Sequence, residues 1–489
     1  MSRVLVRRLL AAAALASAFA ASGCGTKESL VPSLAPETGL FVEGTVDTVN
    51  HVVRIFWYGN DSDGEVVGFE VRFHNAAAPG DTAWQFTTRT DSTFTVFTPA
   101  GFTAPRFEVR ALDDDGLRDE SPAFADFSFT NLPPVARITG APGAGDSTYA
   151  SATIDWSITD PDGDVNAVRY RVWLDGQDST TVPLVTGRRF TVPSAAFLDG
   201  AVFRGGIRTV SIQPIDDGGL AGAIVRTSWF VRETSPSVRL LIVDDLPSSN
   251  PLNQSSDQLY IDAAQRNLVD PATWSVLRLQ FNNTFRSAED MRQTFALFDA
   301  VIWYRGDRDA TTATAVDPLR DLQEGIAAYI EGGGRILLEG RGLFRSTDVS
   351  GANTGSLQPS LASRIFGSDR LAEYPPTGGA TDSPIVWGIN NGRILRSSTW
   401  ADSLRFAASR SGVFAFEVQD TSNVTFWARA GVLSQNNAVD RAVGINVPHP
   451  SGGRAIVFAF PLRVANGYNN VQLPGRVLDR VFQALGLAP

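Results

Sequence analysis

The chain has 489 residues, of which 43% are hydrophobic, and its 42 Lys and Arg against 52 Asp and Glu give a formal net charge of −10. This length and hydrophobic content predict roughly three domains of ordinary size. An acidic chain without a basic run does not suit a nucleic-acid partner. The single cysteine, Cys24, and the single lysine, Lys27, leave the folded part without a disulfide framework, a cysteine nucleophile, a CxxC zinc site or a P-loop lysine. We therefore expect no cofactor.

The first 23 residues have the pattern of a secretory signal. The positive start MSRVLVRR is followed by the apolar run LLAAAALASAFA and by the small residues Ala21, Ser22 and Gly23, directly before Cys24. Small residues running into a cysteine resemble the lipobox of bacterial lipoproteins, although that family prefers leucine where this chain has Ala21. The resemblance implies that residues 1–23 are removed and that Cys24 carries lipid. The alternative is an ordinary secreted protein with an incidental free thiol.

The lipoprotein resemblance implies attachment to a membrane through the lipid, without a membrane-spanning segment. In bacteria with two membranes, an aspartate after the cysteine keeps a lipoprotein in the inner membrane, so Gly25 implies the outer membrane, on its periplasmic or its surface side. Residues 24–38 are polar with two prolines and are expected to form a linker. Removal of residues 1–23 takes away three arginines and no acid, so the charge becomes 39 − 52 = −13.

Two segments about 100 residues apart resemble each other. The stretch IFWYGNDSDGEV (55–66) aligns with IDWSITDPDGDV (154–165), and VRALDDDGL (109–117) aligns with IQPIDDGGL (212–220). This repeat indicates a domain duplication. Short alternating runs such as GFEVRF and YRVWL, bounded by Gly, Asp and Pro, predict antiparallel β-sandwiches over residues 39–134 and 135–235.

Both copies resemble fibronectin type III or related immunoglobulin-like modules of bacterial surface proteins. The early tryptophans Trp57 and Trp156, the D-x-D-G turn after each of them, the V-x-A-x-D-x-x-G strand end and the linker NLPP (131–134) carry this resemblance. It implies the sandwich fold but says little of function, because such modules serve as stalks, spacers and binding modules alike.

The stretch DPDGD is a candidate calcium loop through Asp160, Asp162 and Asp164. An EF-hand needs a glutamate at its twelfth position, which is Arg171 here and Arg72 in the first copy, so that class of site is excluded. The favoured alternative is a turn in which Asp side chains accept hydrogen bonds from backbone N–H groups two residues on.

Strands and helices alternate over residues 237–489. The predicted strands are RLLIVDD (239–245), TWSVLRLQF (273–281), DAVIWYRG (299–306), RILLEG (335–340) and GGRAIVFAFPLRV (452–464). The predicted helices cover 255–268, 287–298, 317–334 and 473–487, and residues 341–440 are expected to be rich in loops. Such alternation predicts an α/β domain with a parallel sheet covered on both faces.

The order of these elements resembles the class I glutamine amidotransferase-like superfamily, which has a flavodoxin-like fold. The stretches AYIEGGGRILLEGRG and GRAIVFAFPL and the terminal helix carry the resemblance. The family's G-x-C-x-G nucleophile elbow falls on residues 338–342, with Gly340 in the cysteine's place, and its H-P-E triplet falls on Phe460, Pro461 and Leu462. Because nucleophile and base are both replaced, we expect no inherited amidase or peptidase chemistry. His449 is interpreted as a surface loop residue.

Ligands of open α/β sheets bind beyond the carboxyl ends of the strands. Charged residues at those ends form a candidate ligand-binding crevice: Asp244, Asp245, Arg305, Asp307, Arg308, Glu339 and Arg341. They are suited to a polar ligand such as a sugar or peptide, with Trp303 and Tyr304 nearby for stacking. The alternative is that they neutralise one another as ion pairs.

Three functions remain open. The first is a non-catalytic, lipid-anchored envelope protein that displays a degenerate amidotransferase-like domain on two sandwiches and binds a glycan or an envelope protein. The second is a carbohydrate hydrolase with Asp244 or Asp245 and Glu339 as acid and base, which requires an open cleft and a carboxyl of raised pKa. The third is a subunit of a surface-assembly system that makes its contacts through the sandwiches, which an exposed apolar patch there would support.

Overall fold

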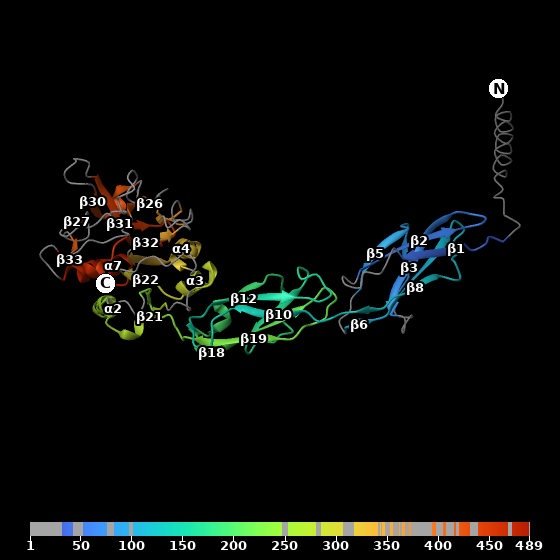
Figure 1. Ribbon diagram of the computed structural model, residues 1–489, viewed down its shortest axis with the longest axis horizontal. Helices are drawn as coiled ribbons and strands as arrows, with labels where there is room; N and C mark the ends of the chain where they lie inside the picture. Colours follow the sequence, from blue (N-terminus) through green and yellow to red (C-terminus); the bar gives the residue numbers. More distant parts are fainter. Residues whose placement is uncertain are drawn as a thin grey trace, which may run out of the picture. The chain divides into compact units, whose positions relative to one another are not determined.

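The computed structural model describes residues 32–42, 52–75, 83–96, 101–246, 253–279, 285–306, 317–340, 343, 345–347, 353–355, 361, 364–366, 371–372, 394–397, 404–406, 415–416, 420–430, 439–467 and 472–488 (Figure 1). Two compact units make up the chain. One contains the first sandwich with the loops Thr159–Arg169 and Pro214–Ala223, and the other contains Ala136–Ile158, Tyr170–Gln213 and Ile224–Pro489.

The first sandwich has a three-stranded and a four-stranded antiparallel sheet. The first sheet has the order β1 (Glu37–Val42), β2 (Val52–Asn60) and β5 (Asp91–Thr95), and the second has the order β4 (Gln85–Thr87), β3 (Val66–Asn75), β7 (Pro105–Asp113) and β8 (Ala123–Asp126). Burial alternates along β7, as expected for a strand with one face on a core. Trp57 is buried there, with its ring 5.4 Å from that of Phe107.

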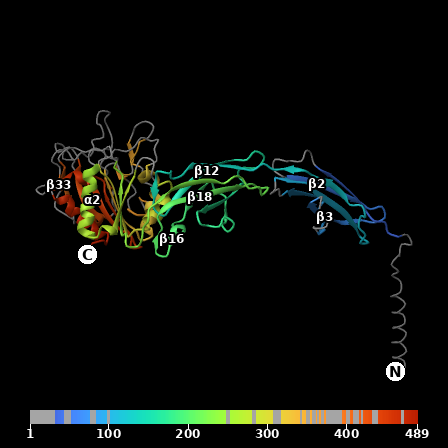
Figure 2. The ribbon, with the colours of Figure 1, turned by 90° about the horizontal axis from the view of Figure 1, so that it is seen from below.

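The second sandwich repeats this strand order. One sheet is β10 (Val135–Gly140), β12 (Ala152–Thr159) and β15 (Arg189–Val192), and the other is β11 (Ser147–Thr148), β19 (Val225–Val231), β18 (Gly206–Ile215), β13 (Arg169–Leu174) and β14 (Leu184–Val185). Figure 2 shows β12 and β18 in its two layers. Trp156 is buried and packs edge-on against Tyr170 at 5.1 Å, as the repeat predicts from the place of Trp57. β11 has no counterpart in the first sandwich and pairs in parallel with β19, whereas other pairs, such as β2 with β5 and β18 with β19, are antiparallel. The prediction of two β-sandwiches built mainly from antiparallel strands is confirmed.

Five parallel strands form one side of the following sheet, from the edge strand β21 (Trp274–Arg278) through β20 (Leu240–Asp244), β22 (Ala300–Gly306) and β23 (Arg335–Gly340) to β32 (Arg454–Phe458). Successive residues of β20 and β22 face opposite sides. Leu241 and Trp303 pack with α3 (Ala288–Phe295) and α5 (Gln323–Glu331), whereas Leu240 and Tyr304 pack with α2 (Asn253–Leu268) and α7 (Leu473–Ala484). Helices therefore cover both faces of these strands.

Two predictions for this region are wrong in detail. The helix expected over 317–334 is divided at Leu322 into α4 (Pro318–Asp321) and α5, and Asp317 caps α4 by accepting a hydrogen bond from the Leu319 N–H. The region expected to be rich in loops contributes antiparallel strands that extend the sheet, among them β27 (Ile394–Ser397), β30 (Val424–Ala430) and β31 (Val439–Pro448). Their pairing with one another and with β32 satisfies backbone groups that the sequence leaves without a local partner.

The second unit joins its sandwich to the parallel sheet through a buried contact. Tyr149 of the sandwich packs edge-on against Phe298 at 5.1 Å, and its hydroxyl donates to Ser275 Oγ at 2.7 Å. Gln293 Oε1 accepts a hydrogen bond from the Ser194 N–H at 2.6 Å. Because apolar packing and hydrogen bonds act together at this contact, we expect the sandwich and the sheet to unfold together.

Candidate binding site

The aspartate loops of the two sandwiches make the same backbone contacts. Asp63 accepts a hydrogen bond from the Leu34 N–H at 3.1 Å, and Asp162 accepts one from the Leu132 N–H at 2.8 Å. Each accepting residue also donates its own N–H to the aspartate two positions before it, as in an Asx turn. The D-x-D-G motif thus holds the segment that enters each sandwich.

The candidate calcium ligands take part in these turns. Asp164 accepts a hydrogen bond from the Asn166 N–H at 2.8 Å, and burial raises the pKa of Asp160 to about 6, with the charges of Asp216 and Asp162 adding to the effect. Among the residues that the structure describes, no three His, Cys, Asp or Glu side chains converge as a metal site would require. The geometry is that of the turn alternative, and calcium binding stays a prediction.

The predicted crevice is occupied by a buried ion-pair cluster. Arg305 donates from Nε to Asp245 Oδ2 at 2.8 Å and from Nη2 to Asp317 Oδ1 at 2.6 Å, and its side chain is 1% exposed. Burial alone lowers the pKa of Arg305, and the charges of Asp245 and Asp317 more than reverse this, so the guanidinium stays protonated. Asp317, the third member, was not predicted because it lies before a helix rather than at a strand end.

Asp244 belongs to a second cluster at the same edge of the sheet. It accepts a hydrogen bond from the Leu246 N–H at 3.0 Å and lies 3.7 Å from Arg278 Nε, while Arg278 also pairs with Asp257 at 3.0 Å. The Tyr304 hydroxyl donates to Asp257. Burial raises the pKa of Asp244 to about 6, and the charge of Asp257 adds to this rise.

Glu339 lies at the end of β23 and is 0% exposed; it accepts a hydrogen bond from the Leu462 N–H. Asp244 and Asp245 are each 2% exposed. The expected stacking position of Trp303 and Tyr304 in an open crevice is wrong, because both rings are buried in the core. Asp307, Arg308 and Arg341 lie outside the described residues.

The burial of these carboxylates helps to decide between an open ligand-binding crevice and a set of ion pairs. A hydrolytic pair of carboxylates needs an open cleft between its members. The carboxylates described here are enclosed, and each has an arginine or a backbone N–H as its partner. The geometry favours the ion-pair alternative and gives no support to a carbohydrate hydrolase; ligand binding by these residues stays a prediction.

The position expected for a nucleophile has no room for a side chain. Gly340 has φ 141°, and a Cβ added there would lie 2.8 Å from Arg305 Cβ and 2.9 Å from the Gly306 backbone nitrogen. Phe460 and Leu462, at the positions of the family's histidine and glutamate, are buried, and the Phe460 ring lies 5.5 Å from that of Phe458. His449 lies in the turn between β31 and β32, where Nδ1 is 2.8 Å from Ser451 Oγ. Of the positions to which the resemblance assigns catalytic groups, Gly340 has no room for a side chain, and Phe460 and Leu462 are apolar and buried.

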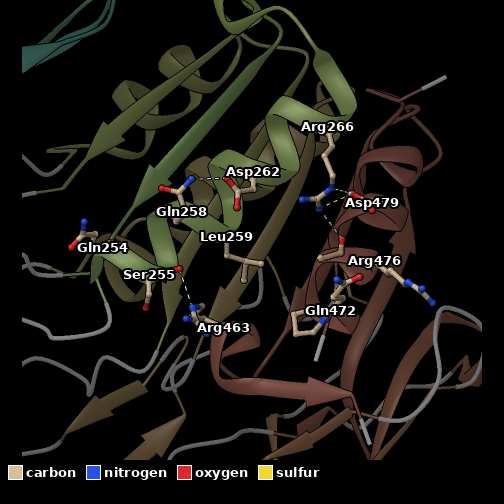
Figure 3. A pocket seen from close by; sticks show the side chains of 12 residues that line it. Gln254, Ser255, Gln258, Leu259, Asp262, Arg266, Arg463, Gln472, Arg476 and Asp479 are labelled. Carbon is tan, nitrogen blue, oxygen red and sulfur yellow. Dashed lines mark hydrogen bonds and ion pairs between the residues drawn. The ribbon is translucent and has the colours of Figure 1, made fainter. Parts of the chain in front are cut away.

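A pocket of about 900 Å³ lies instead in a groove between α2 and α7 (Figure 3). Polar side chains at four-residue spacing on α2 form one wall: Gln254, Gln258, Asp262 and Arg266. Gln472, Arg476 and Asp479 form the facing wall, and Leu259 and Pro474 add apolar surface.

Arginines bridge the two sides of the groove at both ends. Arg266 donates from Nη2 to Asp479 Oδ1 at 2.9 Å and to the Gly475 carbonyl at 3.3 Å. Gly475 permits this approach, because a Cβ there would lie 3.3 Å from Arg266 Nη2. Arg463 donates from Nε to the Ser255 carbonyl at 2.9 Å. These contacts appear as dashed lines in Figure 3.

The groove was missed because its two walls are more than 200 residues apart in the sequence. The four-residue spacing on α2 was a usable signal, since residues i and i+4 lie on one face of a helix. From the sequence alone, this spacing was interpreted only as the polar side of an amphipathic helix.

The sheet orders are those of immunoglobulin-like β-sandwiches. Similar solved structures include the fibronectin(III)-like modules of Clostridium thermocellum CbhA, with 17% identity, coverage of 40% of this chain and 94% of that chain, and a TM-score of 0.19. The chicken CNTN1 FN1-FN3 domains match with 15% identity, coverage of 44% and 69%, and a TM-score of 0.19. The PKD1 domain of Vibrio anguillarum Epp matches with 19% identity, coverage of 20% and 94%, and a TM-score of 0.14. No family model matches the chain, and neither does any curated protein.

Proposed function

We propose that the protein is a lipid-anchored envelope protein whose α/β domain is a degenerate, non-catalytic relative of the class I glutamine amidotransferases and serves for binding. The observation that carries this proposal is the crowding at Gly340, where the family's cysteine would overlap Arg305 and Gly306. An enzyme of that class needs the attacking atom within hydrogen-bond reach of a base. The attacking group has no space at Gly340, and the position of the base holds Phe460, which cannot accept a proton.

The order of the parallel strands supports the flavodoxin-like assignment. Numbered along the chain, they run 2-1-3-4-5, with helices on both faces, which is one of the two common doubly wound arrangements. A resemblance of fold does not carry activity with it, so the binding role rests on the site rather than on the family.

Anchoring through Cys24 is supported by the signal pattern of residues 1–23. Cys24 lies outside the described residues. Ten residues later, Leu34 is held by Asp63 at the D-x-D-G turn of the first sandwich. An extended chain of ten residues spans at most about 35 Å, so that end of the sandwich lies within this distance of the lipid. None of the helices in the described ranges combines the length and the apolarity that crossing a bilayer requires.

The lipid anchor is tested by growing the native host with an alkyne-labelled palmitate. We expect label on the wild-type protein, loss of label in Cys24→Ala, and recovery of the wild type with the outer-membrane fraction. The non-catalytic assignment is tested on the same preparation with glutamine, peptide and oligosaccharide substrates. An unmodified Cys24 thiol, or turnover that Gly340→Ala abolishes, would contradict the proposal.

A second candidate function, surface assembly through the sandwiches, is favoured by exposed aromatic side chains on the first of them. Tyr58 lies over Gly39, its cross-strand partner, and the adjacent pair Phe41 and Phe56 stacks at 5.0 Å. Tyr58 and Phe41 are more than half exposed, and exposed aromatic patches often mark protein contacts. Pull-down from solubilised envelope should recover a partner with the wild type and lose it with Phe41→Ser and Tyr58→Ser. Equal recovery would reject this candidate.

A further inference from the structure

The groove between α2 and α7 has an excess of positive charge within an acidic protein. Arg463 and Arg476 line it, and neither has a carboxylate partner among the described side chains. Of the five N–H donors of Arg463, only Nε–H has a partner in the described part of the chain, the Ser255 carbonyl. Figure 3 draws no contact from Arg476.

Three arginines near the carboxyl ends of the strands or in the groove differ from these two, because each is paired with an aspartate. Arg266, Arg278 and Arg305 are each bound to an aspartate, and the Arg266–Asp479 pair is neutral overall. Arg463 is held at the wall of the groove through its Nε. Its remaining donors and those of Arg476 would be satisfied by a negatively charged ligand.

The groove also contains acceptors, which exclude a bare anion as the best ligand. Asp262 Oδ1 accepts a hydrogen bond from Gln258 Nε2 at 2.5 Å, and no described residue donates to its Oδ2. A ligand here must accept hydrogen bonds from arginine and donate to a carboxylate and to the side-chain amides of Gln254, Gln258 and Gln472. Hydroxyl groups do both, and an acidic sugar combines hydroxyl groups with a carboxylate.

We propose that the α2–α7 groove binds a short oligosaccharide that contains uronic acid. Its volume of about 900 Å³ is in the range of pockets that enclose ligands of this size. Arg476 and Arg463 bind the carboxylate, Asp262 and the glutamine amides bind the hydroxyls, and Leu259 and Pro474 contact the apolar face of a sugar ring. This inference rests on the proposed function, because it gives the α/β domain a ligand in place of a substrate.

The test is calorimetric titration of the mature lipidated protein in detergent with trigalacturonate, and with maltotriose as the neutral probe. We expect binding of trigalacturonate and at least tenfold weaker binding of maltotriose. Arg476→Gln should weaken trigalacturonate binding about tenfold, the equivalent of one charge-assisted hydrogen bond. Asp262→Ala should weaken binding of both probes. The matched control is Arg480→Gln, an exposed arginine of α7 that does not line the groove and should leave affinity unchanged.

The outcomes separate this inference from the proposed function. Absence of binding, equal binding of the two probes, or equal effects of Arg476→Gln and Arg480→Gln would overturn the groove as an acidic-sugar site, and the lipid label would be unaffected. Chromatography of the titrated trigalacturonate gives the second readout. Intact sugar agrees with binding alone, whereas cleaved sugar would overturn the non-catalytic assignment and leave the site in place.

Discussion

Replacing Arg305 by methionine should strongly destabilise the α/β part of the chain. Methionine approximates the length of the aliphatic stem but donates no hydrogen bond, so Asp245 and Asp317 would stay buried without a positive partner. Removing one member of a buried ion pair costs about 3–5 kcal/mol. Because Arg305 serves two carboxylates, we expect a loss near the upper end, about 4–5 kcal/mol.

Two further variants test whether the uncompensated charge is the cause. Asp245→Asn keeps an oxygen acceptor for Arg305 and should cost only about 1–3 kcal/mol. Adding Asp245→Asn and Asp317→Asn to Arg305→Met removes both buried charges and should recover at least about 2 kcal/mol of the loss. A steric explanation predicts no such recovery, since the volumes of Asp and Asn are almost equal.

The assay is hydrogen–deuterium exchange of peptides from β22 and α4 in the mature chain along a urea series. A single unfolding midpoint would not suffice, because a chain of several modules need not unfold in one step. The reasoning is refuted if Arg305→Met changes the free energy of opening of these peptides by less than about 1 kcal/mol, or if the neutralised triple variant is no more stable than the single variant.

Three other predictions concern stability. Gly340→Ala should destabilise the same peptides by about 2–4 kcal/mol, because Gly340 has a positive φ and the added Cβ would meet the Gly306 backbone. The control Gly145→Ala should have little effect, because a Cβ there would have nothing within 4 Å. Equal effects of the two variants would contradict the crowding argument. Val269 is 80% exposed at φ 60°, so Val269→Gly should raise the free energy of opening of peptides from α2 by about 1 kcal/mol. A lowered free energy of opening would count against strain. Burial raises the pKa of Asp290 to about 6, against about 3.9 in an unfolded chain. The folded state therefore holds a proton that the unfolded state releases, and stability falls by about 2 kcal/mol from pH 4 to pH 7. Urea unfolding of Asp290→Asn should lack this part of the fall, and an unchanged pH slope would refute it.

The repeated motifs illustrate what could be predicted from the sequence. Trp57 and Trp156 align in the repeat, and both lie in a sandwich core, as expected where the same strand has the same buried face in both copies. The D-x-D-G turns were predicted on the same ground, since an Asx turn joins residues two positions apart. The parallel strands were predicted from unbroken apolar runs in the sequence. Every residue of β20 and β22 is buried, because helices cover both faces of these strands.

The sequence by itself thus determined most of the local elements and the duplication of the sandwiches. Only the tertiary structure decided what the charged residues do: that Asp245 and Arg305 are joined by Asp317 in a closed cluster, and that Arg266 meets Asp479 across a groove. The physical reason is the separation along the sequence over which each effect acts. Periodicity and turn chemistry act between residues a few positions apart, whereas the pairing of a charge, and its exposure to a ligand, depend on which distant segment packs beside it.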